Sequence, residues 1–367
     1  MLTIKTHLYS SFIIYWDIQS IALLAIVILM VCLLSFMLLY LLVKAGHEKK
    51  HTYWRSKSDT LIHKAVFDDE EKIDDMFIEE TLGSDNLKKN RYFRKILTEE
   101  IISAKKNISG AAADNLIDLY RLFELDKYAI RNLNHLKWYI RAKAIHELTT
   151  MQISELVDHL HLFINDPNEY VRMEAQSALV QFNGFEGLSF LDTIAYPISD
   201  WQQIKLLQLL SHLPPSSIDT TPWFESKNSS VAVFALKLAR NYNRFEQHDA
   251  IAKCLDHSDA KVRLEAILCL NEIYTDETSD HLIGRFLKES LNHQLAMIRV
   301  MQTLGTERDI LFLTDLLNHE SDQLKLDAAR ALAHASNNGM AALEAYSEQS
   351  EQDITEIVMH IKREMSV

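Results

Sequence analysis

Residues 259–270 read DAKVRLEAILCL, and two other stretches of the chain repeat their pattern. Residues 166–179 read DPNEYVRMEAQSAL, and residues 324–332 read LKLDAARAL. In each stretch an apolar residue is followed by a basic residue, any residue, an acidic residue and Ala. Two more residues of the apolar face stand three and four positions after this Ala. This spacing predicts one buried face of an α-helix. The small Ala side chain predicts that this face packs closely on a neighbouring helix.

The pattern returns about every 30 residues. Counted at the basic position, the copies fall at residues 141, 172, 205, 232, 263, 296 and 325, and the register of the degenerate copy near 205 stays open. Such a period with helical spacing inside each unit predicts an all-α fold, an α-solenoid of helix pairs joined by short polar turns. The positions expected to hold the repeats together are Arg141, Arg172, Ala175, Arg263, Ala266, Lys325 and Ala328.

These segments resemble HEAT repeats in the short form common in bacteria. The resemblance covers roughly residues 135–345, and the whole solenoid is assigned to residues 111–367. It implies a scaffold that binds protein partners along the second helix of each unit. Some short-HEAT relatives attach bilin pigments to proteins, which leaves a lyase-like or small-molecule-binding protein as an alternative.

The segment from Asn115 to Leu148 looks like the lead-in of membrane-anchored bacterial HEAT proteins. Genes for such proteins often lie beside those for envelope glycosyltransferases. The resemblance therefore implies a membrane-associated protein partner, with a glycosyltransferase that makes an exopolysaccharide as one expectation.

The N-terminal region carries the pattern of a single transmembrane helix, assigned to residues 18–44. No charged residue occurs from Ile18 to Val43. The 23 almost wholly apolar residues from Ile21 to Val43 would form a helix of roughly 34 Å, enough to cross a hydrocarbon core of about 30 Å. A cleaved signal peptide is the main rival, but its apolar region would be shorter and a small-residue cleavage site would follow it. An interfacial aromatic belt is expected before the span at Tyr9, Phe12, Tyr15 and Trp16.

Charge predicts the orientation of this helix. Basic residues follow the span, opposed by Glu48 alone, whereas Lys5 and Asp17 precede it. The positive-inside rule therefore places residues 1–17 outside the cytoplasm and the solenoid in the cytoplasm, at an inner membrane. Residues 1–57 carry a net charge of +4. Since the whole chain carries −13, the remaining residues carry −17. The basic residues after the span are Lys44, Lys49, Lys50, Arg55 and Lys57.

A helical linker is expected at residues 45–110. Its segment 68–80 reads DDEEKIDDMFIEE and is strongly acidic. This segment could be a docking helix for a basic partner, which would make the protein a signalling adaptor. The alternative is a solvated helix that pairs with the basic start of the helix expected from Leu87 to Lys106.

The sequence contains no recognisable catalytic, cofactor or metal motif. There is no Walker loop, no G-x-S-x-G, no G-x-G-x-x-G and no H-E-x-x-H. The three Cys form no C-x-x-C pair, and Cys254 and Cys269 are expected to pack as small apolar residues. The acidic balance argues against nucleic-acid binding. We therefore expect a protein that is not an enzyme and that uses no cofactor or metal.

A partner-binding strip can be predicted from the repeat register. Positions two, five and nine residues after the basic position are expected to form an exposed ridge, polar at its ends and apolar at its centre. The competing interpretation is a wrong register, in which case these residues belong to the core. The predicted strip comprises Leu207, Leu210, Phe234, Lys237, Leu268, Ile298 and Met301.

Overall fold

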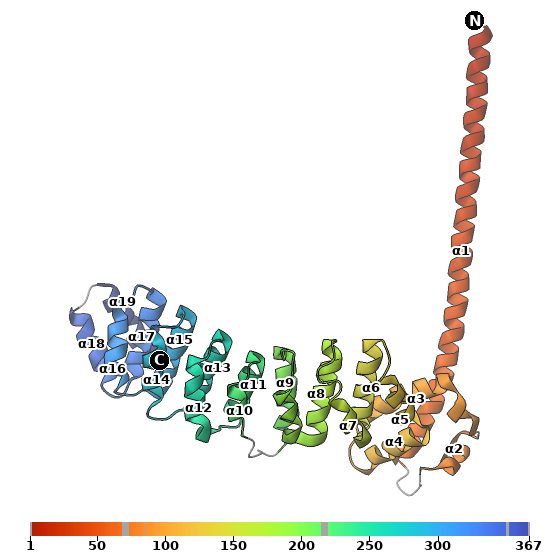
Figure 1. Cartoon of the computed structure of the whole chain (residues 1–367). Coiled ribbons are helices and arrows are strands. Elements are labelled where there is room, and N and C mark those ends of the chain that lie inside the picture. The colour runs from red at the N-terminus through yellow and green to blue at the C-terminus, as the bar shows by residue number, and fades with distance from the viewer. Residues whose placement is uncertain (1, 68–72, 84, 214–218, 350–351, 366–367) are drawn as a thin grey trace. The chain divides into compact units, whose positions relative to one another are not determined.

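The computed structural model describes residues 2–67, 73–83, 85–213, 219–349 and 352–365, with the side chains of 2–20, 22, 85, 86, 349, 352 and 353 outside that description. The regular elements in these ranges are all helices (Figure 1), which confirms the predicted all-α class for the part of the chain described. Two compact units are present. The first comprises Met1–Asn134 and Thr150–Ile153, and the second comprises His135–Thr149 and Ser154–Val367.

The first unit begins with one long helix, α1 (Leu2–Phe67). From Ile21 to Val43 its large apolar side chains are 47–71% exposed. Among the described residues this is the one helix long and apolar enough to cross a membrane, with a mean hydropathy of 3.1 over its most apolar window. A signal sequence near the N-terminus meets the same criterion. The aromatic residues of the expected belt have side chains outside the described residues: Tyr9, Phe12, Tyr15 and Trp16.

The last turns of α1 belong to a folded core. Leu61 and Ala65 are fully buried where α1 packs on α3 (Arg91–Lys105) and α4 (Ala111–Leu122). The Trp54 ring lies 5.5 Å from the Phe93 ring, centroid to centroid, so Trp54 serves core packing. Two further helices complete the unit: α2 (Asp75–Leu82) and α5 (Leu125–Asn132).

The acidic segment makes intramolecular ion pairs. Lys88, in the 3-10 segment Asp85–Lys89, pairs with Asp75 on α2. Lys64 Nζ on α1 lies 3.7 Å from a carboxylate oxygen of Glu80. The expected pairing with the basic start of the next helical segment is confirmed for Lys88 and Asp75, whereas Glu80 pairs with α1 instead; residues 68–72 of the acidic segment lie outside the described ranges. The predicted domain ranges stay predictions; in the structure α1 runs through residues 17 and 44.

The second unit is a row of helix pairs. The second helices of the pairs are α6 (Trp138–Thr150), α8 (Glu169–Asn183), α9 (Asp200–Ser211), α11 (Ser229–Asn241), α13 (Ala260–Leu270), α15 (Leu291–Leu304) and α17 (Asp322–His334). The first helices are short: α7 (Val157–Leu160), the 3-10 helix Gly184–Asp192, α10 (Thr221–Phe224), α12 (His248–Lys253), α14 (Thr278–Phe286) and α16 (Asp309–Asp315). After them come α18 (Gly339–Gln349) and α19 (Gln352–Met365), which pack on α17.

Local sequence explains where these helices begin and how closely they pack. Asn168, Asn228 and Asp259 each accept a hydrogen bond from a backbone N–H in the first turn of the helix that follows, which satisfies a donor without an intrahelical partner. The pattern residues Ala175, Ala266 and Ala328 are fully buried, as predicted. Gly187 lets the 3-10 helix after α8 approach α8, because a Cβ there would lie 2.3 Å from the Leu179 carbonyl oxygen.

Candidate functional site

The N-caps give the true register of the repeats. Each second helix is preceded by a residue at its cap, and the residue four positions later is taken here as the reference position. The steps between successive reference positions are then 31, 31, 29, 31, 31 and 31 residues, more regular than the sequence pattern indicated. The reference positions are Arg141, Arg172, Gln203, Ala232, Arg263, Gln294 and Lys325.

The reference side chain fixes the turn that enters its helix. Nη1 of Arg172 donates to the carbonyl oxygens of Asp166 and Pro167 at 2.8 and 3.1 Å. Arg141 and Arg263 make the same two bonds to the residues five and six positions before them. Nε2 of Gln203 repeats one of these bonds, to the residue five positions before it. This shared geometry confirms that residue 203, and not 205, is the equivalent position of the third repeat.

The three arginines also link neighbouring repeats. Nη2 of Arg141 lies 2.9 Å from Oδ2 of Asp166. The Arg172 guanidinium lies over the Tyr196 ring, 4.1 Å from its centroid. Since each partner precedes the next second helix, these contacts join one repeat to the following one. The predicted structural role of Arg141 and Arg172 is confirmed, whereas the Lys325 ammonium contacts Asp322 of its own helix at 3.4 Å.

A third link is built around a buried carboxylate. The Glu289 side chain is fully buried. Its Oε1 accepts from Nε of Arg263 at 2.7 Å and from Nε of Arg285 at 3.0 Å, and its Oε2 lies 2.6 Å from Nδ1 of His293. Burial by itself would raise the pKa of Glu289, but the hydrogen bonds from Arg263, Arg285 and His293 outweigh it and lower that pKa to about 2. The cluster ties α13, α14 and α15 together.

The predicted partner-binding strip is largely wrong. Leu210, Phe234, Ile298 and Met301 are fully buried, so they belong to the core. For three of them the sequence register was two residues late, because residues 205 and 296 were taken for the reference positions 203 and 294. Phe234 stands two residues after a correct reference position, where Glu265 and Asp327 are buried as well. Of the remaining members of the strip, Leu268 is 39% exposed, while Leu207 and Lys237 are half-buried.

The position two residues before the reference position is the one that faces solvent: it is exposed in six of the seven second helices and half-buried at Ser230 in the other. Aromatic side chains occupy this position in three consecutive repeats. Tyr139, Tyr170 and Trp201 are 51%, 60% and 67% exposed, and we call these three residues the aromatic row. The Trp138 ring stacks on the Tyr170 ring with centroids 5.2 Å apart and planes 19° apart, which joins the first two repeats. Ile204, one helical turn after Trp201, is 56% exposed.

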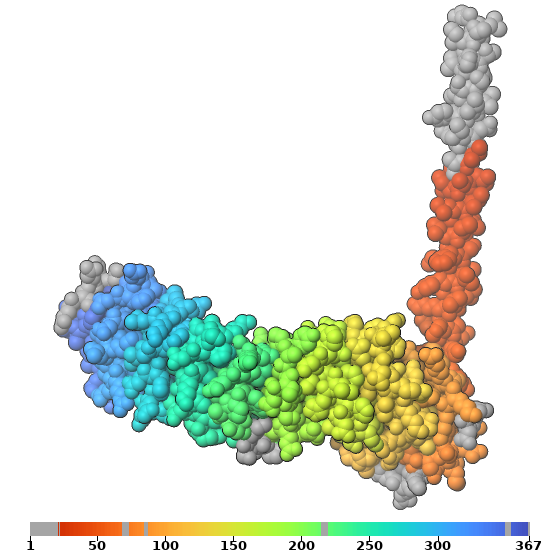
Figure 2. Space-filling model, in the orientation of Figure 1, coloured from red at the N-terminus to blue at the C-terminus, as the bar shows by residue number. Residues whose placement is uncertain are grey.

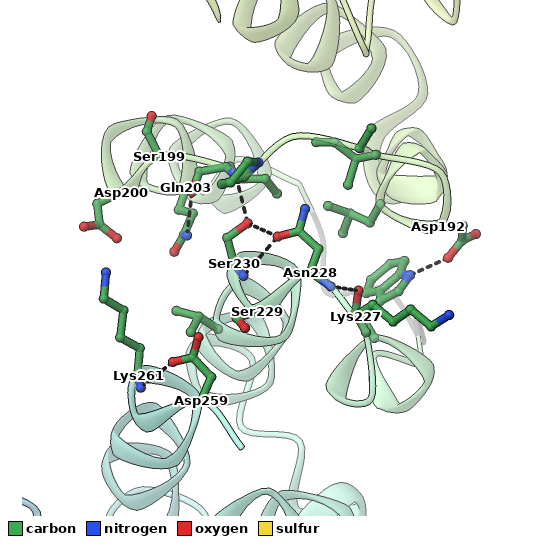
Figure 3. A pocket seen from close by; sticks show the side chains of 18 of the residues that line it. Asp192, Ser199, Asp200, Gln203, Lys227, Asn228, Ser229, Ser230, Asp259 and Lys261 are labelled. Atoms are coloured by element: carbon green, nitrogen blue, oxygen red, sulfur yellow. Dashed lines mark hydrogen bonds between the residues drawn. The ribbon is translucent and has the colours of Figure 1, made fainter. Parts of the chain in front are cut away.

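A groove lies beyond the aromatic row along the solenoid, at the N-terminal ends of α9, α11 and α13. Its volume is about 1000 Å³, and its walls carry Ser, Asn, Asp and Lys side chains (Figure 3). Ser230 Oγ accepts from the Ile198 N–H at 2.8 Å and donates to Asn228 Oδ1 at 2.7 Å. Trp223 Nε1 donates to Asp192 Oδ1 at 2.6 Å. These bonds hold the walls of the groove in place and leave Lys227 and Lys261 exposed at its edge.

The remaining candidate reactive groups are structural. Cys254 and Cys269 are buried, as expected, and burial raises the pKa of each thiol to about 12. They are therefore thiols rather than thiolates at neutral pH. Among the side chains that the structure describes, no three His, Cys, Asp or Glu gather as a metal site would require.

The aromatic row is visible in the sequence as a regular spacing, although its residues are not part of the repeat pattern. Tyr139, Tyr170 and Trp201 follow one another at intervals of 31 residues. The repeat pattern is defined by buried positions, whose small and apolar side chains vary little between units. An aromatic residue repeated at an exposed position becomes visible only once the caps fix the register.

Residues 249–333 match the family model described as HEAT repeats. Together with the helix pairs, this match makes the chain a HEAT-repeat α-solenoid protein, as the sequence resemblance implied. HEAT repeats serve in general as scaffolds for protein–protein interaction. In Figure 2 the matched residues run from turquoise to blue along the second unit.

A search of curated proteins found no match to the chain. Among solved structures, human deoxyhypusine hydroxylase in complex with glycerol is similar at 13% identity, over 85% of this chain and 96% of that chain, with a TM-score of 0.28. Kap121p is similar at 12% identity over 84% of this chain and 43% of its own length, with a TM-score of 0.42. Importin beta is similar at 11% identity over 87% and 48%, with a TM-score of 0.36. The chain spans less than half the length of these last two proteins, and likenesses at this level carry no argument about activity or partner.

Proposed function

We propose that the protein is a membrane-anchored scaffold without catalytic activity, which binds a protein partner through the exposed face of its second helices. The observation that carries this proposal is the aromatic row. Large aromatic side chains are costly to leave in water, and they dominate the energetics of protein interfaces. Three of them at one repeat position form a surface that the core of the solenoid does not need.

The anchor is inferred from α1. Side chains from Ile21 to Val43 are apolar on every face of the helix, and none of the described ones in this stretch is buried by the rest of the chain. Such a stretch is stable in hydrocarbon and not in water. The basic residues after the stretch favour a cytoplasmic location for the solenoid. A partner held in the same membrane would meet the solenoid at a raised effective concentration, and an envelope glycosyltransferase fits that description.

The membrane location is tested by fractionation of the full chain. We expect the protein to stay with the membrane after washes with carbonate and high salt, and a cysteine-free chain carrying Tyr274→Cys to be labelled by an impermeant maleimide only after the cells are opened. Labelling in intact cells would place the solenoid on the other side. Release by the washes would overturn the anchor.

Partner binding is tested by purification of the full chain from its native membrane in mild detergent, followed by mass spectrometry. The matched variants are Trp201→Ala, in the aromatic row, and Tyr274→Ala, whose ring is 52% exposed in the turn after α13. We expect a stoichiometric partner that Trp201→Ala loses and Tyr274→Ala keeps. Equal recovery with both variants would overturn the assignment of the binding face.

A further inference from the structure

The folded part of the first unit begins close to the end of the apolar stretch of α1. The ring of Tyr92, in the first turn of α3, lies 5.9 Å from the His47 ring, centroid to centroid, and the Lys50 ammonium lies 5.0 Å from the Tyr92 centroid. At about 1.5 Å per residue, His47 and Lys50 stand about 6 Å and about 10 Å beyond Val43, where the apolar stretch ends. The headgroup layer of a bilayer is about 5–8 Å thick. The Tyr92 ring is therefore level with the outer part of that layer.

Contacts farther along the two helices show which end of α3 faces the membrane. The Phe93 ring lies 5.5 Å from the Trp54 ring, and the Glu100 carboxylate lies 3.0 Å from Nε of Arg55. Later residues of α3 thus meet later residues of α1, so the two helices run in the same direction. The N-terminal end of α3 points toward the membrane, and its C-terminal end, at Lys105, points away from it.

Cationic side chains gather at the membrane-facing end of the unit. Arg91 and Lys95 stand one helical turn apart on α3, and three lysines of α1 follow its apolar stretch. Helical side chains tilt toward the N-terminus of their own helix, which for α1 and α3 is the direction of the membrane. We call these five exposed residues the basic collar: Lys44, Lys49, Lys50, Arg91 and Lys95.

The acids near the collar are too few to balance it. The turn between α4 and α5 lies at the same end, since the Phe93 and Phe123 rings are 5.8 Å apart and Arg94 donates to the Glu124 carbonyl oxygen at 3.0 Å. Residues 44–51, 89–95 and 121–131 together hold ten Lys or Arg against three acids, a net charge of +7 with His neutral. The ion pair of Lys88 with Asp75 adds no net charge. The three acids are Glu48, which lies 3.9 Å from Lys44, Glu124, which lies 2.8 Å from Lys127, and Asp126.

We propose that the basic collar binds the phosphate groups of anionic phospholipids, in the leaflet on the C-terminal side of the apolar stretch of α1. Each Lys or Arg close to an anionic leaflet strengthens binding about fivefold. The Tyr92 ring would lie among the headgroups, where Tyr side chains are favoured. The inference rests on the proposed membrane anchor. It adds that the core of the first unit is seated on the membrane surface and is not held away from it by a free length of α1.

The test counts the lipids that bind to the full chain. The protein is purified in a neutral detergent and given equal amounts of phosphatidylglycerol and phosphatidylcholine with the same acyl chains, and native mass spectrometry counts the molecules of each lipid that stay bound. We expect phosphatidylglycerol to be preferred at least about tenfold at low salt, and less at high salt because salt screens exposed charges.

Two double variants on the same helix give the matched comparison. Arg91→Gln with Lys95→Gln should lower the preference for phosphatidylglycerol at least about fivefold. Lys105→Gln with Lys106→Gln removes the same charge from the other end of α3, where Lys105 stands about 15 Å farther along the helix than Lys95, and should leave the preference unchanged.

A second measurement places α3 at the leaflet. A cysteine-free chain in nanodiscs carries a bimane label at either Lys95→Cys or Lys106→Cys, and lipids with a nitroxide on the headgroup quench labels close to the membrane surface. We expect strong quenching at residue 95 and little at residue 106.

Three results would overturn the proposal: equal retention of the two lipids, equal losses from the two double variants, and equal quenching at the two labelled positions. If the chain stays with the membrane through the carbonate wash but shows none of the expected differences, the collar inference fails and the anchor stands. Release by that wash would overturn the anchor and this inference together.

Discussion

Glu174 on α8 and Glu265 on α13 occupy the same position of the repeat, two residues after the reference position, yet their surroundings differ. Glu174 lies 3.3 Å from both His146 and Lys205, on the helices before and after it. Glu265 has one close cation, Arg240, at 3.1 Å. Burial would raise the pKa of Glu174, but the bond to His146 and the charge of Lys205 outweigh it and lower that pKa. For Glu265 burial prevails over Arg240, and its pKa is raised.

A second comparison concerns two aromatic residues that stand at different positions of the repeat. Phe234 on α11 is fully buried, whereas Trp201 on α9 is 67% exposed. Both stand on second helices. Trp201 lies two residues before its reference position, and Phe234 lies two residues after its own. The repeat position therefore decides whether an aromatic side chain faces the core or the solvent, while the paired glutamates show that neighbouring units set the charge around one such position.

The largest expected effect separates the two aromatic residues. Phe234→Ala leaves a cavity in the core and should lower the free energy of unfolding by about 3–5 kcal/mol. Trp201→Ala removes an exposed ring and should change it by less than about 0.5 kcal/mol. Urea unfolding of the full chain in detergent, followed by circular dichroism, measures both. Similar losses for the two variants would contradict the assignment of core and exposed face.

The next effect compares two acids that link repeats. Glu289→Gln removes a buried charge that is bonded to two arginines and to His293, and should cost about 3 kcal/mol. Asp166→Asn should cost about 1–2 kcal/mol, because Arg141 keeps its bonds to the carbonyls of His135 and Leu136. The urea midpoints of the two variants give the comparison. A smaller loss for Glu289→Gln than for Asp166→Asn would refute the three-partner cluster.

Acid should weaken the α13–α15 region through Glu289. Its pKa is about 2 in the folded chain and about 4.5 when unfolded, so the unfolded state binds its proton first as the pH falls. The stabilisation of about 3 kcal/mol is present above pH 5 or so, and is lost progressively as the pH falls toward 2. Urea midpoints between pH 7 and pH 3 should fall less steeply for Glu289→Gln than for the unaltered chain. Parallel profiles would contradict this role.

These comparisons show how far the sequence predicts the molecule. Val171, Val262 and Leu324, each one residue before a reference position, are fully buried, so the helix pairs and their core could be read from spacing alone. The third and sixth repeats were misplaced because Gln203 and Gln294 stand where four of the other five units carry Arg or Lys. One-residue or two-residue shifts move a helical position by 100° or 200°, which is enough to exchange core and surface. Leu210, Ile298 and Met301 were assigned to the exposed strip for that reason.

The smallest expected effect returns to the paired glutamates. Glu174→Gln removes a carboxylate whose charge the neighbouring helices favour, and should lower the free energy of unfolding by about 1 kcal/mol at pH 7. Glu265→Gln removes a charge that burial disfavours, and should leave stability unchanged or raise it. As the pH falls through the raised pKa of Glu265, the unaltered chain binds that proton in the folded state first, so any advantage of Glu265→Gln should shrink toward acid. Equal losses from the two substitutions at pH 7 would mean that the repeat position alone sets the energy of the acid, and that neighbouring repeats do not.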